Sequence, residues 1–436
     1  MKALLNASAK AKVAILVAAL GYFVDVYDLL IFSIVRVPSL KDIGVSSDNL
    51  LNDGVLLLNA QMIGMLLGGM LWGVLGDKLG RIQVLFGSIL LYSIANLANA
   101  FVNSVEAYAV WRFLAGVGLA GEIGAGITLV SELMCKESRG LGTTVVATVG
   151  VSGALLAALV GDNVHWRTAY VIGGVMGLAL LVLRVSVHES GLFNSIKSHA
   201  VVRGDLRMLF TSRERFSRYL SCIAIGLPVW FVTGVLLTFS PEISKSLGLT
   251  EPISVAKCMI GHSIGITLGD LASGLLSQYL RSRKKAIGLF LICALTFSCI
   301  LLMAPIKSAD AYYMLWFPLG FFIGYWAVFV TSAAEQFGTN LRATVTTTAP
   351  NFVRGTSVIM TTLFSAMKGD LGVIGSAEVV AVLTFTISAW ALLSLRETFG
   401  TDLNFYERTE GGIEYHEHKD DGSFGQEVEL KVANGR

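Results

Sequence analysis

Hydrophobic residues in this chain occur in runs of roughly 20, and short segments rich in Gly, Pro or charge separate the runs. A helix of that length covers ~30 Å, the thickness of the hydrocarbon core of a bilayer. The pattern therefore predicts twelve transmembrane helices, at about residues 13–35, 54–76, 82–102, 106–132, 140–161, 168–187, 219–241, 253–277, 286–305, 309–333, 343–366 and 372–395.

The longest internal connection divides these helices into two sets of six. It covers residues 188–218 and follows the sixth predicted helix. We therefore expect an N-terminal six-helix bundle at 1–187, an inter-bundle loop at 188–218 and a C-terminal bundle at 219–396. Residues 397–436 are polar and Gly-rich, so a mobile tail is expected there.

Composition and charge support a membrane protein and orient it. Only 15% of the 436 residues are charged, 54% are hydrophobic and the mean hydropathy is +0.67, whereas soluble domains average about 25% charged residues. If the N-terminus is cytoplasmic, 24 of the 33 Lys and Arg residues lie on the cytoplasmic side and 6 on the opposite side. The positive-inside rule then places both termini inside, as expected for a multi-pass protein of a bacterial inner membrane.

The two halves of the chain carry matching segments. Glu132–Arg139 (ELMCKESR) and Glu335–Arg342 (EQFGTNLR) share a Glu-x6-Arg pattern after helices 4 and 10. Gly73–Arg81 (GVLGDKLGR) matches the degenerate segment Gly274–Arg283 (GLLSQYLRSR) at a similar offset. Matches at near-constant offset indicate a duplicated six-helix unit, as in transporters whose site lies between two halves.

The segment GVLGDKLGR, taken together with the repeated Glu-x6-Arg pattern, resembles the signature of the major facilitator superfamily. The resemblance covers nearly the whole chain and implies an all-α membrane fold of two pseudo-symmetric six-helix bundles. It also implies a cytoplasmic charge relay that holds the outward-facing state closed. In the second copy of the motif, Gln278 stands where an acidic residue is expected. The alternative to a relay is that these charges only anchor the loops on the cytoplasmic side. The relay residues would be Asp77, Arg81, Glu132 and Arg139 in the first half, with Glu335 and Arg342 in the second.

Two further segments favour import by symport over drug export. The run WRFLAGVGLAGEIGAGITLVSEL in helix 4 and the ending VSVHES of helix 6 resemble the sugar, phosphate and metabolite symporter branches of the family. Helix 5 (GVSGALLAALVG) lacks the proline typical of drug–proton antiporters.

Acidic residues inside the predicted helices are candidates for proton coupling. Asp25 and Asp28 lie on one face of helix 1, and a carboxylate at such depth costs ~2.5 to 3.5 kcal/mol unless it is solvated or paired. Helix 4 brings Arg112 within reach of Asp28, and it places Glu122 slightly to the cytoplasmic side of the membrane centre. Either Asp28 binds a proton when Arg112 moves away, or the two form a static ion pair.

The second half offers candidates for binding a solute. Arg354 lies near the middle of helix 11 beside Asn351 and has no acid in its own helix, so it needs an anionic partner. That partner could be Asp270 of helix 8 or a carboxylate or phosphate of the solute. His262 could titrate or could simply join two helices, and the aromatic residues could line a cavity or only pack. The remaining candidates are Tyr27, Gln61, Trp230, Tyr325 and Trp326.

These patterns predict a monomeric secondary transporter that works by alternating access and imports a small polar solute, anionic or zwitterionic, together with protons. The five cysteines form no C-x-x-C and have no nearby His, so neither a zinc site nor a disulfide framework is expected. No cofactor, metal or nucleic acid is expected, only the solute, protons and lipid. The alternatives are a siderophore or polycarboxylate carrier, an amino acid or nucleoside importer, a neutral sugar porter, and a channel or sensor of the same fold. No motif of a membrane enzyme occurs.

Overall fold

The computed structural model describes residues 9–79, 81–121, 139–184, 209–210, 212–400, 405–407 and 413–415. Every predicted hydrophobic run contains a helix within these ranges. The helices are α2 (Ala9–Asp42), α3 (Leu50–Leu79), α4 (Arg81–Asn99), α5 (Val105–Leu119), α7 (Arg139–Asn163), α8 (Trp166–Arg184), α11 (Arg213–Ile225), α12 (Leu227–Trp230), the π-helix η1 (Phe231–Leu237), α13 (Ser240–Ser246), α14 (Val255–Tyr279), α15 (Arg283–Met303), α16 (Ala309–Met314), α17 (Trp316–Ile323), α18 (Trp326–Glu335) and α19 (Thr339–Ser394).

Helix lengths and composition confirm a membrane protein of many spans. Within the described ranges, eight helical stretches are long and apolar enough to cross a bilayer. The last of them contains both of the final predicted helices, because α19 runs through 56 residues and would be ~84 Å long if straight. Gly372, at φ 70° and ψ 177°, has a backbone conformation that no helix allows, so it divides α19 into two separate helical pieces.

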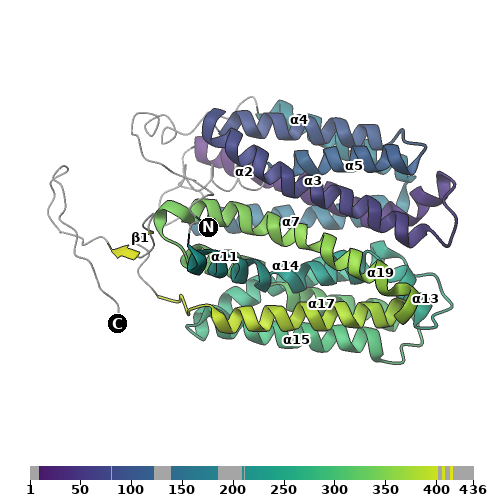
Figure 1. Cartoon of the computed structure of the whole chain (residues 1–436). Helices are drawn as coiled ribbons and strands as arrows, with labels where there is room; N and C mark the ends of the chain where they lie inside the picture. Colours follow the sequence, from purple (N-terminus) through teal and green to yellow (C-terminus); the bar gives the residue numbers. More distant parts are fainter. Residues whose placement is uncertain are drawn as a thin grey trace.

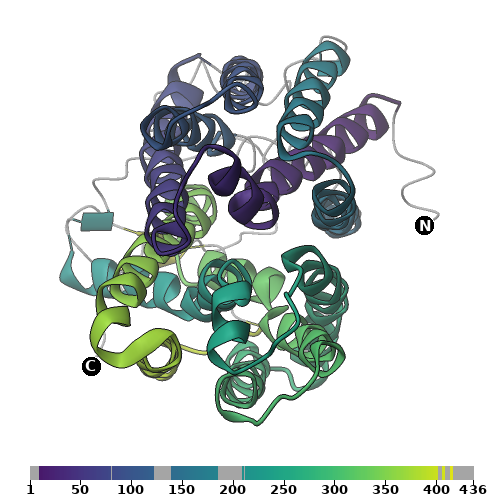
Figure 2. The ribbon, with the colours of Figure 1, turned by 90° about the vertical axis from the view of Figure 1, so that its right-hand side faces the viewer.

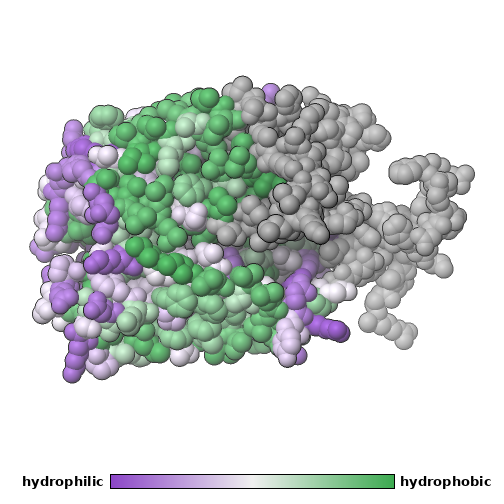
Figure 3. Space-filling view, turned by 180° about the vertical axis from the view of Figure 1, so that it is seen from behind, coloured by the Kyte–Doolittle hydropathy of each residue, from purple (hydrophilic) through white to green (hydrophobic). Residues whose placement is uncertain are grey.

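The helices form two groups that lie side by side. Figure 2 shows α2 to α8 in one group and α11 to α19 in the other. Helix α13 marks one end of the molecule and β1 the other (Figure 1), and we call these the α13 end and the β1 end. Hydrophobic side chains cover the middle of the face in Figure 3, and hydrophilic ones gather at the α13 end, as expected for a protein surrounded by lipid. The predicted domain boundaries stay a prediction, since residues 185–208 lie outside the described ranges.

Glycines allow close helix packing in both groups. A Cβ at Gly269 of α14 would lie 2.0 Å from the carbonyl oxygen of Phe321 in α17, and one at Gly265 would lie 2.3 Å from that of Phe317. In the first group, a Cβ at Gly116 of α5 would lie 2.1 Å from the carbonyl oxygen of Gln61 in α3. These positions therefore exclude any side chain, which is the small-residue packing expected between membrane helices.

The tail differs in part from the sequence expectation. Strands β1 (Phe405–Glu407) and β2 (Ile413–Tyr415) pair as an antiparallel hairpin. Glu407 is buried and forms ion pairs with Arg218 at 3.0 Å and Arg215 at 3.5 Å, at the start of α11. The expectation of a mobile tail is therefore wrong for this hairpin, because two arginines of the bundle hold its glutamate.

Candidate functional site

The acids of α2 are buried inside the first group of helices. Asp25 and Asp28 are fully buried. A Cβ at Gly173 of α8 would lie 2.2 Å from Oδ1 of Asp28, so this glycine makes room for the carboxylate. Among the described residues Asp28 forms no ion pair, and its polar neighbour is the side chain of Asn96. A carboxyl without an ion pair in such surroundings is a candidate for protonation, because burial disfavours its charged form.

Arg112 lies close to these acids but does not form an ion pair with Asp28 within the described ranges. Its guanidinium sits over the ring of Phe32, 4.3 Å from the centroid, and donates to the amide oxygen of Gln61. Phe32 follows Asp28 by one helical turn on the same face of α2. Gln61 is therefore a direct partner of Arg112, and a static Asp28–Arg112 pair is absent from this conformation. Glu122 lies outside the described residues.

Buried hydroxyl groups extend from this region toward the α13 end. Tyr170 and Tyr108 share a hydrogen bond of 2.7 Å, and Tyr108 donates to Ser39 at 3.3 Å. Tyr27, a predicted binding residue, instead donates to the carbonyl of Ala169 at 2.8 Å. The hydroxyl of Tyr27 therefore joins α2 to α8 in this conformation.

Arg354 is the central cation of the second group. Its side chain is buried, and its Nε and Nη1 atoms have no hydrogen-bond partner among the described residues. Asp270 does not pair with it: Oδ1 of Asp270 accepts from the backbone N–H of Ala327 at 3.0 Å. The carboxylate of Asp270 thus lies at the N-terminus of α18, a favourable place for an anion.

Other polar groups lie where the two helix groups meet. The side-chain nitrogen of Asn351 would lie 3.3 Å from a Cβ at Gly69 of α3, so this amide faces the first group. Tyr22 of α2 lies within electrostatic range of Arg354, Asp25 and Asp270. Arg354 is therefore close to the acidic face of α2, across the boundary between the groups.

His262 joins two helices of the second group. Its Nε2 lies 3.2 Å from the hydroxyl of Thr233 in η1, while Nδ1 has no partner among the described residues. Trp230 precedes η1 and is buried. Tyr325 donates to the carbonyl of Ile225 at 2.9 Å, and Trp326 packs on Phe329 with ring centroids 5.1 Å apart. Tyr325 and Trp326 therefore have packing roles in this conformation.

The β1 end carries ion pairs that differ from the expected relay. Glu335 pairs with Arg283 at 3.1 Å, while Arg342 donates to the carbonyls of Ala334 and Phe337. Burial opposes ionisation of Glu397, yet hydrogen bonds from the Ser282 hydroxyl and nearby backbone N–H groups lower its pKa below the usual range.

The first-half relay is only partly visible. Glu132 lies outside the described residues, and for Asp77, Arg81 and Arg139 the structure describes the backbone only.

A gate at the α13 end was not expected from the sequence. Arg36, fully buried, forms an ion pair of 2.8 Å with Glu242 of α13 and donates to the carbonyl of Thr238 at 3.1 Å. Ser33 and Thr238 share a hydrogen bond of 3.0 Å. Arg36 stands near the apparent end of its hydrophobic run, so only the continuation of α2 to Asp42 reveals that it lies inside a helix.

More polar contacts join the two groups on the same side. Ser254 donates to Asp162 at 2.9 Å, Asn59 donates to Thr362 at 3.0 Å, and Ser365 donates to Asn52 at 3.1 Å. We call these contacts, with those of Arg36 and Ser33, the α13-end gate. They join segments about 90 to 310 residues apart in the chain, and they close this end of the molecule.

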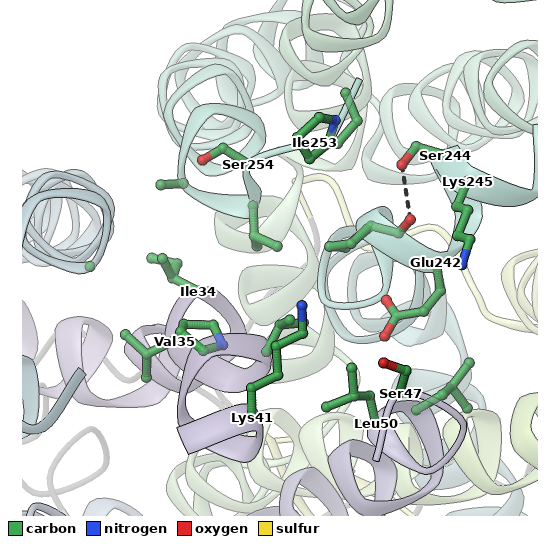
Figure 4. A pocket seen from close by; sticks show the side chains of 18 of the residues that line it. Ile34, Val35, Lys41, Ser47, Leu50, Glu242, Ser244, Lys245, Ile253 and Ser254 are labelled. Carbon is green, nitrogen blue, oxygen red and sulfur yellow. Dashed lines mark hydrogen bonds between the residues drawn. The ribbon is translucent and has the colours of Figure 1, made fainter. Parts of the chain in front are cut away.

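A cavity of 1620 Å³ lies outside the gate. Residues of both helix groups line it, among them Leu50, Lys41 and Glu242. Figure 4 shows the Glu242 carboxylate pointing into the cavity above Ser47, with the amine of Lys41 pointing into the same space from α2. The cavity is therefore a vestibule whose floor includes one partner of the Arg36–Glu242 pair.

Three relatives of this chain are named as transporters. A protein of Haemophilus influenzae named as a metabolite transport protein is 28% identical over 76% of this chain and 83% of its own length. The 3-(3-hydroxy-phenyl)propionate transporter of Escherichia coli is 27% identical over 67% of this chain and 72% of its own. The gentisate transporter of Corynebacterium glutamicum is 23% identical over 91% of this chain and 90% of its own.

The fold has a counterpart among solved structures. The crystal structure of a D-xylose–proton symporter matches with a TM-score of 0.70 and 18% identity, over 91% of this chain and 100% of that chain. The sequence profile described as Major Facilitator Superfamily matches residues 18–368. With two groups of apolar helices and buried charges close to their boundary, this transporter belongs to the major facilitator superfamily.

Proposed function

We propose that this transporter imports a small aromatic carboxylate together with a proton. The observation that carries the proposal is Arg354, a buried guanidinium with two nitrogens that lack partners among the described residues. An arginine cannot release its proton to escape the cost of burial, so it needs an anion. A solute carboxylate could bind it through two parallel N–H donors.

The names of two relatives support an aromatic acid. Gentisate and 3-(3-hydroxy-phenyl)propionate both combine an aromatic ring with one carboxylate. Such a solute needs a cation for its carboxylate and apolar or aromatic side chains for its ring. Arg354 and Asn351 supply the polar part, and Trp230 is a candidate for the wall that contacts the ring.

We further propose Asp28 as the proton carrier. Its carboxylate is buried beside Gly173 and forms no ion pair among the described residues, while Arg112 lies over Phe32, one helical turn along α2. Movement of Arg112 toward Asp28 would favour the ionised form, and movement away would favour the protonated form. Asp25 and Glu122 are the alternative carriers.

Orientation follows from the positive-inside rule. The β1 end carries many basic residues, including Arg215, Arg218, Arg283 and Lys284, which supports a cytoplasmic position in a bacterial inner membrane. The α13 end would then face outward, and its closed gate would make this conformation inward-facing. We propose that the protein works as a monomer and that the Asp77, Arg81, Glu132 and Arg139 relay closes the β1 end in the opposite state.

Uptake into proteoliposomes tests the proposal. Wild type and the variants Arg354→Lys and Arg354→Gln would be assayed with radiolabelled 4-hydroxybenzoate and, separately, xylose. Both variants should lose most 4-hydroxybenzoate uptake, because lysine keeps the charge but lacks the planar fork of donors. Arg396→Gln is the matched control, because Arg396 is exposed and its replacement removes the same charge. Normal uptake by Arg354→Lys, or uptake of xylose alone, would contradict an anion site at Arg354.

A further inference from the structure

One face of α2 carries three residues at the spacing of successive helical turns. Asp28, Phe32 and Arg36 are four residues apart and therefore line up along the helix. Arg112 covers Phe32 at 4.3 Å, and Arg36 covers the ring of Phe239 at 4.6 Å. Two guanidinium groups thus lie at or near this face, one beside the acid and one at the gate.

Arg36 is held by both halves of the molecule. Within the first half, Nη1 donates to the carbonyl of Leu50 at 3.1 Å. From the second half, Nη2 contacts the carbonyl of Thr238 at 3.1 Å and the carboxylate of Glu242 at 2.8 Å. If the halves separate at this end, the contacts with the second half are lost together, whereas the Leu50 contact remains.

An opened gate would leave Arg36 without its carboxylate. Its Nε already lacks a hydrogen-bond partner among the described residues. Five N–H donors arranged as a rigid fork match a carboxylate, and their positive charge cannot be removed by deprotonation. Glu242 and Leu50 line the vestibule, so the place that Glu242 would vacate is reached directly from it.

We propose that Arg36 is the outer docking residue for the carboxylate of the solute, which takes the place of Glu242 when the gate opens. Solute and Glu242 then exclude each other at Arg36. Closure requires the solute to leave Arg36 and move along the α2 face past Phe32, toward Arg112 and Arg354. The proposal rests on the carboxylate specificity of the proposed function.

A simple strut is the competing explanation, in which Arg36 only closes the gate. Exchanging the two charged residues distinguishes the explanations. The exchanged ion pair can still close the gate, but α2 then has no cation at position 36 that could bind the solute carboxylate. The variants are Arg36→Gln, Glu242→Gln and the double variant Arg36→Glu/Glu242→Arg. Lys245→Gln is the matched control, because Lys245 lines the same vestibule and its loss removes the same charge.

Gate closure and solute capture are measured separately. Spin labels on cysteines placed at Asn49 and Ser246, in a background without the native cysteines, report the distance across the gate. External KM for 4-hydroxybenzoate in right-side-out vesicles reports capture. Arg36→Gln and Glu242→Gln should both lengthen the distance, whereas the double variant should restore it. External KM should rise at least tenfold in Arg36→Gln and stay raised in the double variant. It should fall in Glu242→Gln, because the carboxylate that competes with the solute is removed, and it should stay within about twofold of wild type in Lys245→Gln.

Arg36→Lys provides a second test of the docking role in case the double variant does not fold. Lysine retains an ion pair with Glu242, so the gate distance should match wild type, but the loss of the planar fork should still raise external KM. Recovery of wild-type KM in the double variant, or an unchanged KM in Arg36→Lys and Arg36→Gln, would overturn the docking role and leave a strut. If wild-type protein transports xylose and no carboxylate, the proposed function fails first and the docking role fails with it.

Discussion

The space around Asp28 allows a sharp test through Gly173. Alanine at this position would place its methyl carbon 2.2 Å from Oδ1 of Asp28 and 3.0 Å from Cε1 of Tyr27. Carbon and oxygen normally approach no closer than their van der Waals contact of ~3.5 Å, so the carboxylate would have to retreat by about 1 Å. Tyr27 cannot yield easily, because its hydroxyl is bonded to the carbonyl of Ala169 at 2.8 Å.

Overpacking of this kind costs about 1 to 3 kcal/mol when backbone or side chains must shift. We expect Gly173→Ala to lower the unfolding temperature and to reduce accumulation driven by a pH gradient about tenfold, since displacement of Asp28 changes its distance from Arg112. Counterflow, which needs no net proton movement, should be retained. Gly274→Ala is the control, because a Cβ there meets no atom within 4 Å. Normal accumulation and normal stability of Gly173→Ala would refute the placement of Asp28 and its role in coupling.

Three further predictions address coupling, packing and pH. Asp28→Asn should abolish gradient-driven uptake in proteoliposomes and spare counterflow; retained accumulation would shift the role to another acid. Gly269→Ala should destabilise the fold by about 1 to 3 kcal/mol or prevent folding, because its Cβ would lie 2.0 Å from the carbonyl oxygen of Phe321; an unchanged melting temperature would contradict this packing. The lowered pKa of Glu397 means that its stabilisation is present above the ordinary carboxyl pKa and lost as pH falls through the lowered value. Glu397→Gln should therefore melt below wild type at pH 7, and a difference that persists unchanged at pH 3 would contradict it.

Much of the fold could be predicted because one physical signal repeats. Each run of apolar residues must form a helix in lipid, so the positions of the runs predict where the helices lie along the chain. In α14, Gly261, Gly265 and Gly269 repeat at a spacing of four residues, a pattern typical of close helix packing, and these glycines lie against α17. Such features depend on residues close together in the sequence.

The gate could not be predicted, because it depends on contacts across the two halves. Arg36 and Glu242 are 206 residues apart, and each resembles an ordinary charge at a helix end when taken alone. The pairing of Glu335 with Arg283 rather than Arg342 is similar, since it depends on how α15 meets α18. A local pattern identifies a charged residue but not the partner that the fold brings to it.

Carboxylate recognition is the central claim, and a pair of solutes that differ only in charge tests it most directly. Wild-type proteoliposomes would be given an inward proton gradient and either 4-hydroxybenzoate or 4-hydroxybenzamide, which replaces the carboxylate with a neutral amide of similar shape. We predict that 4-hydroxybenzoate accumulates above its external concentration, that a protonophore abolishes this accumulation, and that 4-hydroxybenzamide neither accumulates nor competes. Equal transport of the two solutes, or competition by the amide at the same concentration, would contradict the assignment of Arg354 to a carboxylate.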